Sequence, residues 1–294
     1  VSQLDPALTR SGRFDRKVYF DPPNASERRD MWRLFMGGVA LPRDMTSQAL
    51  AHRSAGLTGA DIQNVCNLAK LRAIARGAKR HKLSLDDIKE AMDEVIVGRE
   101  KKERTLSDKE RDRVAHHEAG HALLAHMLVD CEPPLKVSIV PRGEAALGFS
   151  QQESDDSRLH TCGAILARVI VLLGGRAAEK LMYGDTSTGA ADDIERASIL
   201  VHRCVHEWGM DPSTGPVNAE AAVGGLLKEG FTRCTEILAV LDKKALDMVS
   251  AHAREIKDLA AHLLRTDTLE KQDLAGILPG SLKNKFQTQV DILG

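Results

Sequence analysis

The sequence has no paired cysteines. Its five cysteines are scattered singly, without a CxxC pair or the even framework that stabilises small secreted domains. They are Cys66, Cys131, Cys162, Cys204 and Cys234. This pattern excludes a disulfide scaffold and predicts buried thiols in a reducing compartment.

The chain also has no long apolar run. Its most apolar stretch, residues 164–175, is interrupted by Arg168, and it is far shorter than the roughly 20 residues that a membrane-spanning helix needs. No charged and then apolar segment resembling a signal peptide opens the chain, and the first residue is Val1 rather than methionine. We therefore expect a fragment that is soluble by itself, with any targeting signal lying upstream.

An excess of one charge is absent as well. The 41 Lys and Arg residues are balanced by 42 Asp and Glu residues, and the formal net charge is -1. Because the two signs are mixed along the chain, we expect no basic face that binds nucleic acid. A length of 294 residues fits one large domain or, as we expect, two ordinary ones. The contents of 43% hydrophobic and 28% charged residues are normal for a soluble globular protein.

The first hundred residues predict a small helical module. Residues 1–22 end in a short β-like segment and read as the end of a larger domain. Asn24 and Glu27 have the spacing of a capping box at the start of a helix. Apolar residues at helical spacing predict two more helices, one after Thr58 and one after Ser84.

A charge-rich run without apolar periodicity, residues 99–106, is typical of a linker between domains. Ser107 and Glu110 then form another predicted capping box, which opens a long helix. The β-branched segment 136–140 and the segment 146–151, on either side of a turn, predict a hairpin. The remainder of the chain is mostly helical in pattern.

A His-Glu-x-x-His segment lies in the middle of this long helix. His117 and His121 are four residues apart, so both imidazoles project from one helix face and can hold one zinc ion. Glu118 can reach a water molecule that such an ion makes acidic, and it is the candidate general base. Ala119 and Gly120 are small and leave room over this face. The same five residues can arise by chance, but their place inside a capped helix favours a zinc site.

A catalytic zinc ion usually has three protein ligands and one open position, so a third ligand is needed. The extended metzincin pattern does not supply it, because Leu124 and Met127 stand where that pattern needs glycine and histidine. A carboxylate is the remaining type. The residues alone leave Glu179, Asp192 and Asp193 open as candidates.

Six features occur in a specific order along nearly the whole chain. They are LDPALTRSGRFDR, LTGAD, HHEAGH, the pair IVPRG and ALGF, GGRAAE, and STGAADDI. Together they resemble the FtsH family of AAA proteases, namely its second region of homology, the start of a lid helix, the zinc helix, a hairpin, a segment near the zinc site and the third-ligand segment. A single match would be weak, whereas six in one order are specific.

The resemblance implies roles for particular residues. It makes Asp193 the third zinc ligand and Glu179 a supporting or structural residue. It also implies that Arg13 and Arg16 are arginine fingers that reach the ATP of a neighbouring subunit. Without the resemblance, these two arginines would read as a surface ion-pair cluster.

The resemblance further implies an ATP-dependent zinc metalloendopeptidase that degrades unfolded or membrane-associated proteins. The implied cofactors are Zn²⁺ and, in the full-length protein only, ATP with Mg²⁺. The implied assembly is a homo- or hetero-hexamer, tethered through an absent N-terminal segment to a bacterial inner, mitochondrial or plastid membrane. The hairpin edge is expected to hold the substrate as an added β-strand.

The sequence departs from this family in two places. It contains no Gly-Lys dipeptide, so the phosphate-binding loop is missing and the fragment is not expected to hydrolyse ATP by itself. Ser11 stands where the arginine-finger segment usually has proline. The alternative function is a non-catalytic AAA assembly or scaffold module, against which the intact Glu118 argues.

The resulting prediction is a mainly α fold. Residues 1–22 are expected to be the remnant of an α/β AAA core, and residues 23–98 a helical AAA lid. After the linker at 99–106, residues 107–294 are expected to form a predominantly helical zinc metallopeptidase domain with a small β-sheet.

Overall fold

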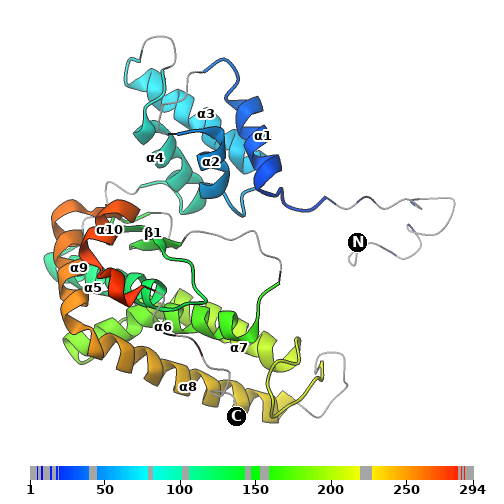
Figure 1. Ribbon diagram of the computed structural model, residues 1–294, viewed down its shortest axis with the longest axis vertical. Helices are drawn as coiled ribbons and strands as arrows, with labels where there is room; N and C mark the ends of the chain where they lie inside the picture. The colour runs from blue at the N-terminus through cyan, green and yellow to red at the C-terminus, as the bar shows by residue number, and fades with distance from the viewer. Residues whose placement is uncertain are drawn as a thin grey trace. The chain divides into compact units, whose positions relative to one another are not determined.

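The structure of the protein is a computed structural model (Figure 1). It describes residues 5, 8, 14, 18, 20–39, 45–78, 82–100, 106–142, 147–152, 159–218, 227–283, 286 and 288, and only the backbone of 227–230. The chain divides into two compact units, Val1–Ile88 and Lys89–Gly294. Helices dominate the described residues of both units, and the second unit also contains one small sheet, which confirms the predicted mainly α fold. The linker expected at 99–106 stays a prediction.

Helices form the described part of the first unit. They are α1 (Ala25–Phe35), α2 (Ser47–Arg53), α3 (Gly59–Ala75) and the start of α4 (Leu85–Ile96). The predicted capping box is present, since Asn24 Oδ1 accepts from Glu27 N at 3.0 Å and the Glu27 carboxylate accepts from Asn24 N at 2.8 Å. Trp32 is fully buried, and its indole N–H donates to Ser54 Oγ at 2.9 Å. This aromatic side chain forms the centre of the small core.

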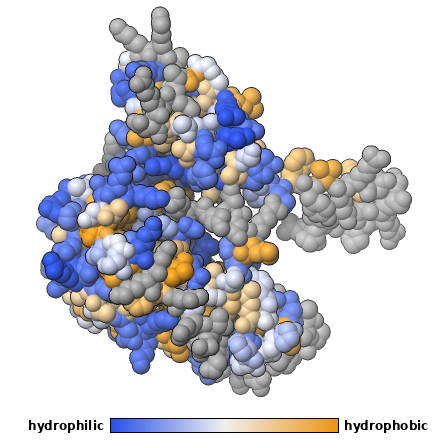
Figure 2. Space-filling view, viewed as in Figure 1, coloured by the Kyte–Doolittle hydropathy of each residue, from blue (hydrophilic) through white to orange (hydrophobic). Residues whose placement is uncertain are grey.

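Helices also dominate the second unit, around a central α5. They are α5 (Asp108–Met127), α6 (Cys162–Tyr183), α7 (Ala191–His206), α8 (Leu227–Ala251), α9 (Ala253–Thr266) and α10 (Lys271–Ile277), with 3₁₀ turns at Thr188–Ala190 and Gly280–Leu282. Helix α5 packs against α6, α8 and α9, and it is buried on every side from Val114 to Met127. A helix buried on all sides belongs to the core of its domain. On the face drawn in Figure 2, hydrophobic residues form separate patches among hydrophilic ones.

Two local features fix α5 in place. At its start, the Ser107 hydroxyl accepts from Glu110 N at 3.3 Å and Ser107 N donates to the Glu110 carboxylate at 2.9 Å, as the capping box predicts. In its middle, α5 crosses α6 at Gly120 and Gly174. A Cβ on Gly120 would lie 2.3 Å from the carbonyl oxygen of Gly174, so the two backbones approach more closely than any side chain allows.

The sheet has three antiparallel strands in the order β2-β1-β3. They are β1 (Pro134–Ser138), β2 (Phe149–Gln152) and β3 (Thr268–Glu270). The pairing of β1 with β2 confirms the predicted hairpin, although β1 begins at a proline, which a strand tolerates as its first residue. Strand β3 was not predicted, and it leaves β2 as the opposite edge of the sheet. Within the described parts of the chain, no helix has both the length and the apolar character to cross a bilayer.

Candidate metal centre

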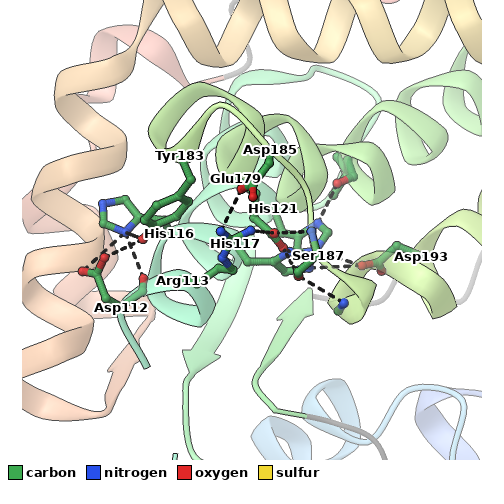
Figure 3. Close-up of polar contacts among 12 residues, drawn as sticks. Asp112, Arg113, His116, His117, His121, Glu179, Tyr183, Asp185, Ser187 and Asp193 are labelled. Atoms are coloured by element: carbon green, nitrogen blue, oxygen red, sulfur yellow. Dashed lines mark hydrogen bonds and ion pairs between the residues drawn. The ribbon is translucent and has the colours of Figure 1, made fainter. Parts of the chain in front are cut away.

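Helix α5 places His117 and His121 one turn apart on the same face. Their rings lie edge to face with centroids 4.7 Å apart, and the two Nε2 atoms are 3.0 Å apart. Both side chains are buried, and they point toward one another in Figure 3. The spacing in the sequence predicts this geometry.

Helix α6 fixes the protonation of both rings. His117 Nδ1 lies 2.8 Å from Glu179 Oε1, and His121 Nδ1 lies 2.7 Å from the carbonyl oxygen of Val171. A carboxylate and a carbonyl can only accept, so each Nδ1 carries the proton and donates it. In the neutral form of each ring, this leaves Nε2 as the nitrogen without a proton, and the two Nε2 atoms face each other.

A carboxylate from the first turn of α7 meets these two nitrogens. Asp193 Oδ2 lies 3.3 Å from His117 Nε2 and 3.3 Å from His121 Nε2. With both rings in this neutral form, all three atoms are acceptors, so their approach requires a proton or a metal ion between them. Ligand bonds of about 2.0–2.1 Å place the ligand atoms of a tetrahedral zinc ion about 3.3 Å apart. Two imidazoles and one carboxylate at these separations fit a catalytic zinc ion.

The pKa values of His117 and Asp193 also favour a positive charge between these side chains. Burial by itself lowers the pKa of His117, but hydrogen bonds to Asp193 and Glu179 outweigh it and raise this pKa to about 10. Burial likewise opposes ionisation of Asp193, yet hydrogen bonds from His117 and His121 hold its pKa well below the ordinary value. The centre thus favours one bound cation, which is a proton or a metal ion.

Glu118 has the environment of a general base. It is 6% exposed, and its Oε2 has no hydrogen-bond partner in the described part of the chain. Burial raises the pKa of Glu118, with His121 and His117 opposing that shift. Gly148, just before β2, lies against this carboxylate, since a Cβ there would stand 2.8 Å from Glu118 Oε1. A buried carboxylate with a raised pKa and an unpaired oxygen suits proton transfer near neutral pH.

Glu179 holds His117 through Nδ1, the ring nitrogen that does not face Asp193. Its carboxylate is 1% exposed and also accepts from Ser187 N at 2.8 Å, the Ser187 hydroxyl at 3.0 Å and Arg113 Nη1 at 3.0 Å. Burial opposes ionisation, but hydrogen bonds from His117, Ser187 and Arg113 lower the pKa of Glu179 to about 2. A carboxylate that is always charged keeps the Nδ1 proton of His117 in place, which makes Nε2 the better ligand atom.

The structure separates the three acidic residues that the sequence leaves open. Asp193 brings an oxygen to both Nε2 atoms, Asp192 is exposed, and Glu179 binds the opposite nitrogen of His117. Sequence reasoning missed the carbonyl of Val171, because a backbone acceptor leaves no signal in the identity of its residue. Each of the two histidines is thus held by α6 and faces α7.

The predicted arginine fingers are a separate matter. Arg13 and Arg16 lie outside the described residues. Their role stays a prediction.

Comparisons with known proteins identify two regions of the chain. The family model of peptidase family M41 matches residues 104–277. The model of the AAA+ lid domain matches residues 46–90. The first match contains the whole His117, Glu118, His121 and Asp193 cluster.

Curated relatives align with almost the entire chain. The ATP-dependent zinc metalloprotease FtsH 1 of Methylacidiphilum infernorum is 38% identical over 291 residues, covering 94% of this chain and 45% of the relative. The ATP-dependent zinc metalloprotease FtsH 3 of Sphaerobacter thermophilus is 40% identical over 279 residues, covering 94% of this chain and 56% of the relative. The chain therefore spans about half the length of the curated relatives that it matches.

Proposed function

This chain belongs to peptidase family M41, and we propose that it is a zinc metalloendopeptidase that hydrolyses peptide bonds in unfolded polypeptides. The observation that carries this proposal is the meeting of two imidazole Nε2 atoms and one carboxylate oxygen, 3.0 to 3.3 Å apart, beside a buried glutamate with an unpaired oxygen. A structural zinc site has four protein ligands and no need for such a glutamate.

His117, His121 and Asp193 would hold the zinc ion. When bound there, the ion polarises the scissile carbonyl and lowers the pKa of a water molecule. Glu179 and the carbonyl of Val171 keep both imidazoles in the tautomer that turns Nε2 inward. The ligand atoms are therefore oriented by α6 before any metal binds.

Glu118 would move the proton. Its Oε2 takes a proton from the attacking water and later delivers it to the leaving amine, so one carboxylate acts first as base and then as acid. Its raised pKa supports both steps, because a higher pKa makes the carboxylate a stronger base and brings the protonated acid closer to neutral pH. Gly148 beside it leaves no side chain between the start of β2 and the carboxylate.

The substrate would bind along β2. This strand is one edge of the sheet, with β1 on its other side, and it begins next to the residue that contacts Glu118. An edge strand offers backbone donors and acceptors to an extended peptide, which gives affinity with little demand on side chains. Such binding suits a peptidase that accepts many unfolded sequences.

The activity of the longer protein is also part of the proposal. The match to an AAA+ lid domain supports assembly into a ring, which we expect to be a hexamer. ATP and Mg²⁺ would bind in a part of the protein that precedes this chain, with Arg13 and Arg16 reaching a neighbour's nucleotide. The relatives are named ATP-dependent, which supports this arrangement. The membrane anchor that the family resemblance implies would lie in the same preceding part.

The test is replacement of Glu118 by glutamine. We expect Glu118→Gln to bind one zinc ion per chain, as the wild type does, and to lose cleavage of an unfolded fluorescent polypeptide. Glu195→Gln, at an exposed position of α7, is the matched control and should retain cleavage. Retained cleavage in Glu118→Gln would exclude the role of this glutamate. A wild type that binds no zinc would instead support the alternative, a non-catalytic assembly module.

A further inference from the structure

One face of α6 is complementary to the metal-binding face of α5. Val171, Gly175 and Glu179 follow one another at intervals of four residues, so they lie on the same side of α6. The carbonyl of Val171 binds His121, and the carboxylate of Glu179 binds His117. Gly175 lies between these two anchoring residues.

Gly175 borders the ring of His117 directly. A Cβ on Gly175 would lie 2.4 Å from Nε2, 2.5 Å from Cε1 and 2.6 Å from Cδ2 of His117. These separations are far below the roughly 3.5–4.0 Å of an ordinary contact between heavy atoms. The imidazole thus occupies the volume that any side chain at position 175 would need.

The ring has no easy alternative position. His117 Nδ1 is held by Glu179, whose carboxylate is itself fixed by three further hydrogen bonds. The two helices cannot separate locally without opening the contact between Gly120 and Gly174, whose backbones touch. A side chain at 175 would therefore rotate the imidazole and turn Nε2 away from Asp193.

We propose that Gly175 is a positioning residue for zinc binding, which acts by leaving the space in which the imidazole of His117 lies. This inference rests on the proposed function, because the atom that Gly175 accommodates is the ligand nitrogen. It differs from the role of Gly120 and Gly174, since a Cβ on either of those would meet the backbone of the other helix, whereas the three nearest atoms to a Cβ on Gly175 all belong to His117. Gly175 therefore serves the metal site rather than the helix crossing.

The first measurement is zinc affinity by competition with a coloured chelator. Gly175→Ala should bind zinc about 10–100-fold more weakly than the wild type, the range typical when the support of a metal ligand is removed. Gly276→Ala is the matched control, because Gly276 lies in α10 with no atom within 4 Å of its added Cβ. The control should bind zinc as the wild type does. Equal affinity of Gly175→Ala and wild type would overturn the proposal.

The second measurement uses metal-free protein, so it does not depend on the proposed activity. Gly175→Ala should lower the melting temperature when His117 is present. In a His117→Ala background the ring is gone, and the same change should be neutral or stabilising, because alanine is the better helix former. Equal destabilisation in both backgrounds would show that Gly175 serves helix packing alone. If Gly175→Ala does not fold, recovery of the fold in the double variant supports the proposal, and continued failure contradicts it.

These outcomes separate the two levels of inference. A wild type that binds no zinc would contradict the proposed function. The melting temperatures of metal-free protein, with Gly175→Ala compared in the wild-type and His117→Ala backgrounds, would still report whether the two side chains compete for one volume. A wild type that binds zinc, with Gly175→Ala unchanged, would contradict only the role of Gly175.

Discussion

Replacing Glu179 by glutamine changes one charge without changing the size of the side chain, and we expect it to weaken zinc binding. Oε1 accepts from His117 Nδ1 at 2.8 Å and from the Ser187 hydroxyl at 3.0 Å. Oε2 accepts from Ser187 N at 2.8 Å and from Arg113 Nη1 at 3.0 Å. A glutamine amide has only one oxygen, so its NH₂ group must face donors in either orientation.

Both orientations disturb the site. If the NH₂ group faces His117, Nδ1 must accept, and the proton of the ring moves to Nε2, the atom that points at Asp193. If it faces Ser187 N and Arg113, two donors lose this acceptor in a partly buried position. Loss of such an outer partner typically lowers metal affinity about 10–100-fold, which corresponds to about 1.4–2.8 kcal/mol.

The assay is a zinc titration in competition with a chelator, on wild type, Glu179→Gln and Glu195→Gln. The last variant makes the same chemical change at an exposed position of α7 and should leave the affinity unchanged. A Glu179→Gln protein with wild-type affinity would refute the reasoning, because it would show that His117 keeps its tautomer without a charged partner.

Two further predictions concern acidic residues. Asp193→Asn should lower zinc affinity by more than the loss of an outer partner does, which is typically about 10–100-fold. Asp192→Asn, at the exposed neighbouring position, should leave zinc affinity unchanged. Equal effects of the two variants in the same titration would contradict the assignment of Asp193 as the ligand. Burial by itself raises the pKa of Asp211, but hydrogen bonds from Arg233 and Ser213 outweigh it and lower this pKa below the ordinary 3.8. The ionised carboxylate therefore stabilises the fold fully above pH 3.8, and this stabilisation is lost as the pH falls through the lowered pKa. When metal-free protein is unfolded with urea, the difference in the free energy of unfolding between wild type and Asp211→Asn should shrink as the pH falls below 3.8. A difference that stays constant with pH would disprove this linkage.

Local signals in the sequence predicted the helix starts well. The capping boxes at Asn24 and Ser107 and the helix start after Thr58 are present in the structure, because each depends on residues within three positions of one another. The pair His117 and His121 was equally predictable, since one helical turn fixes their relation. Sequence reasoning was sufficient wherever both partners lie in the same turn of the chain.

Contacts between distant segments were not predictable in this way. Strand β3 is three residues long and pairs with β1 from more than a hundred residues away, so its pattern carries almost no strand signal. The third ligand was unpredictable from the residues alone for the same reason. Asp193 lies on α7 and His121 on α5, and only the packing of both helices against α6 brings them together. The resemblance to a family supplied the choice of Asp193 that the residues alone left open.

Four residues of the GGRAAE segment, residues 174–179, make four different contacts. Gly174 permits the close crossing with α5, and Gly175 leaves the space for the ring of His117. Arg176 binds both carboxylate oxygens of Asp242 on α8 at 2.6 and 2.7 Å, which links α6 to α8 as well. Glu179 then fixes the tautomer of the histidine. Since Gly175 and Glu179 both contact His117, a substitution at either position should act on the metal centre without replacing a ligand.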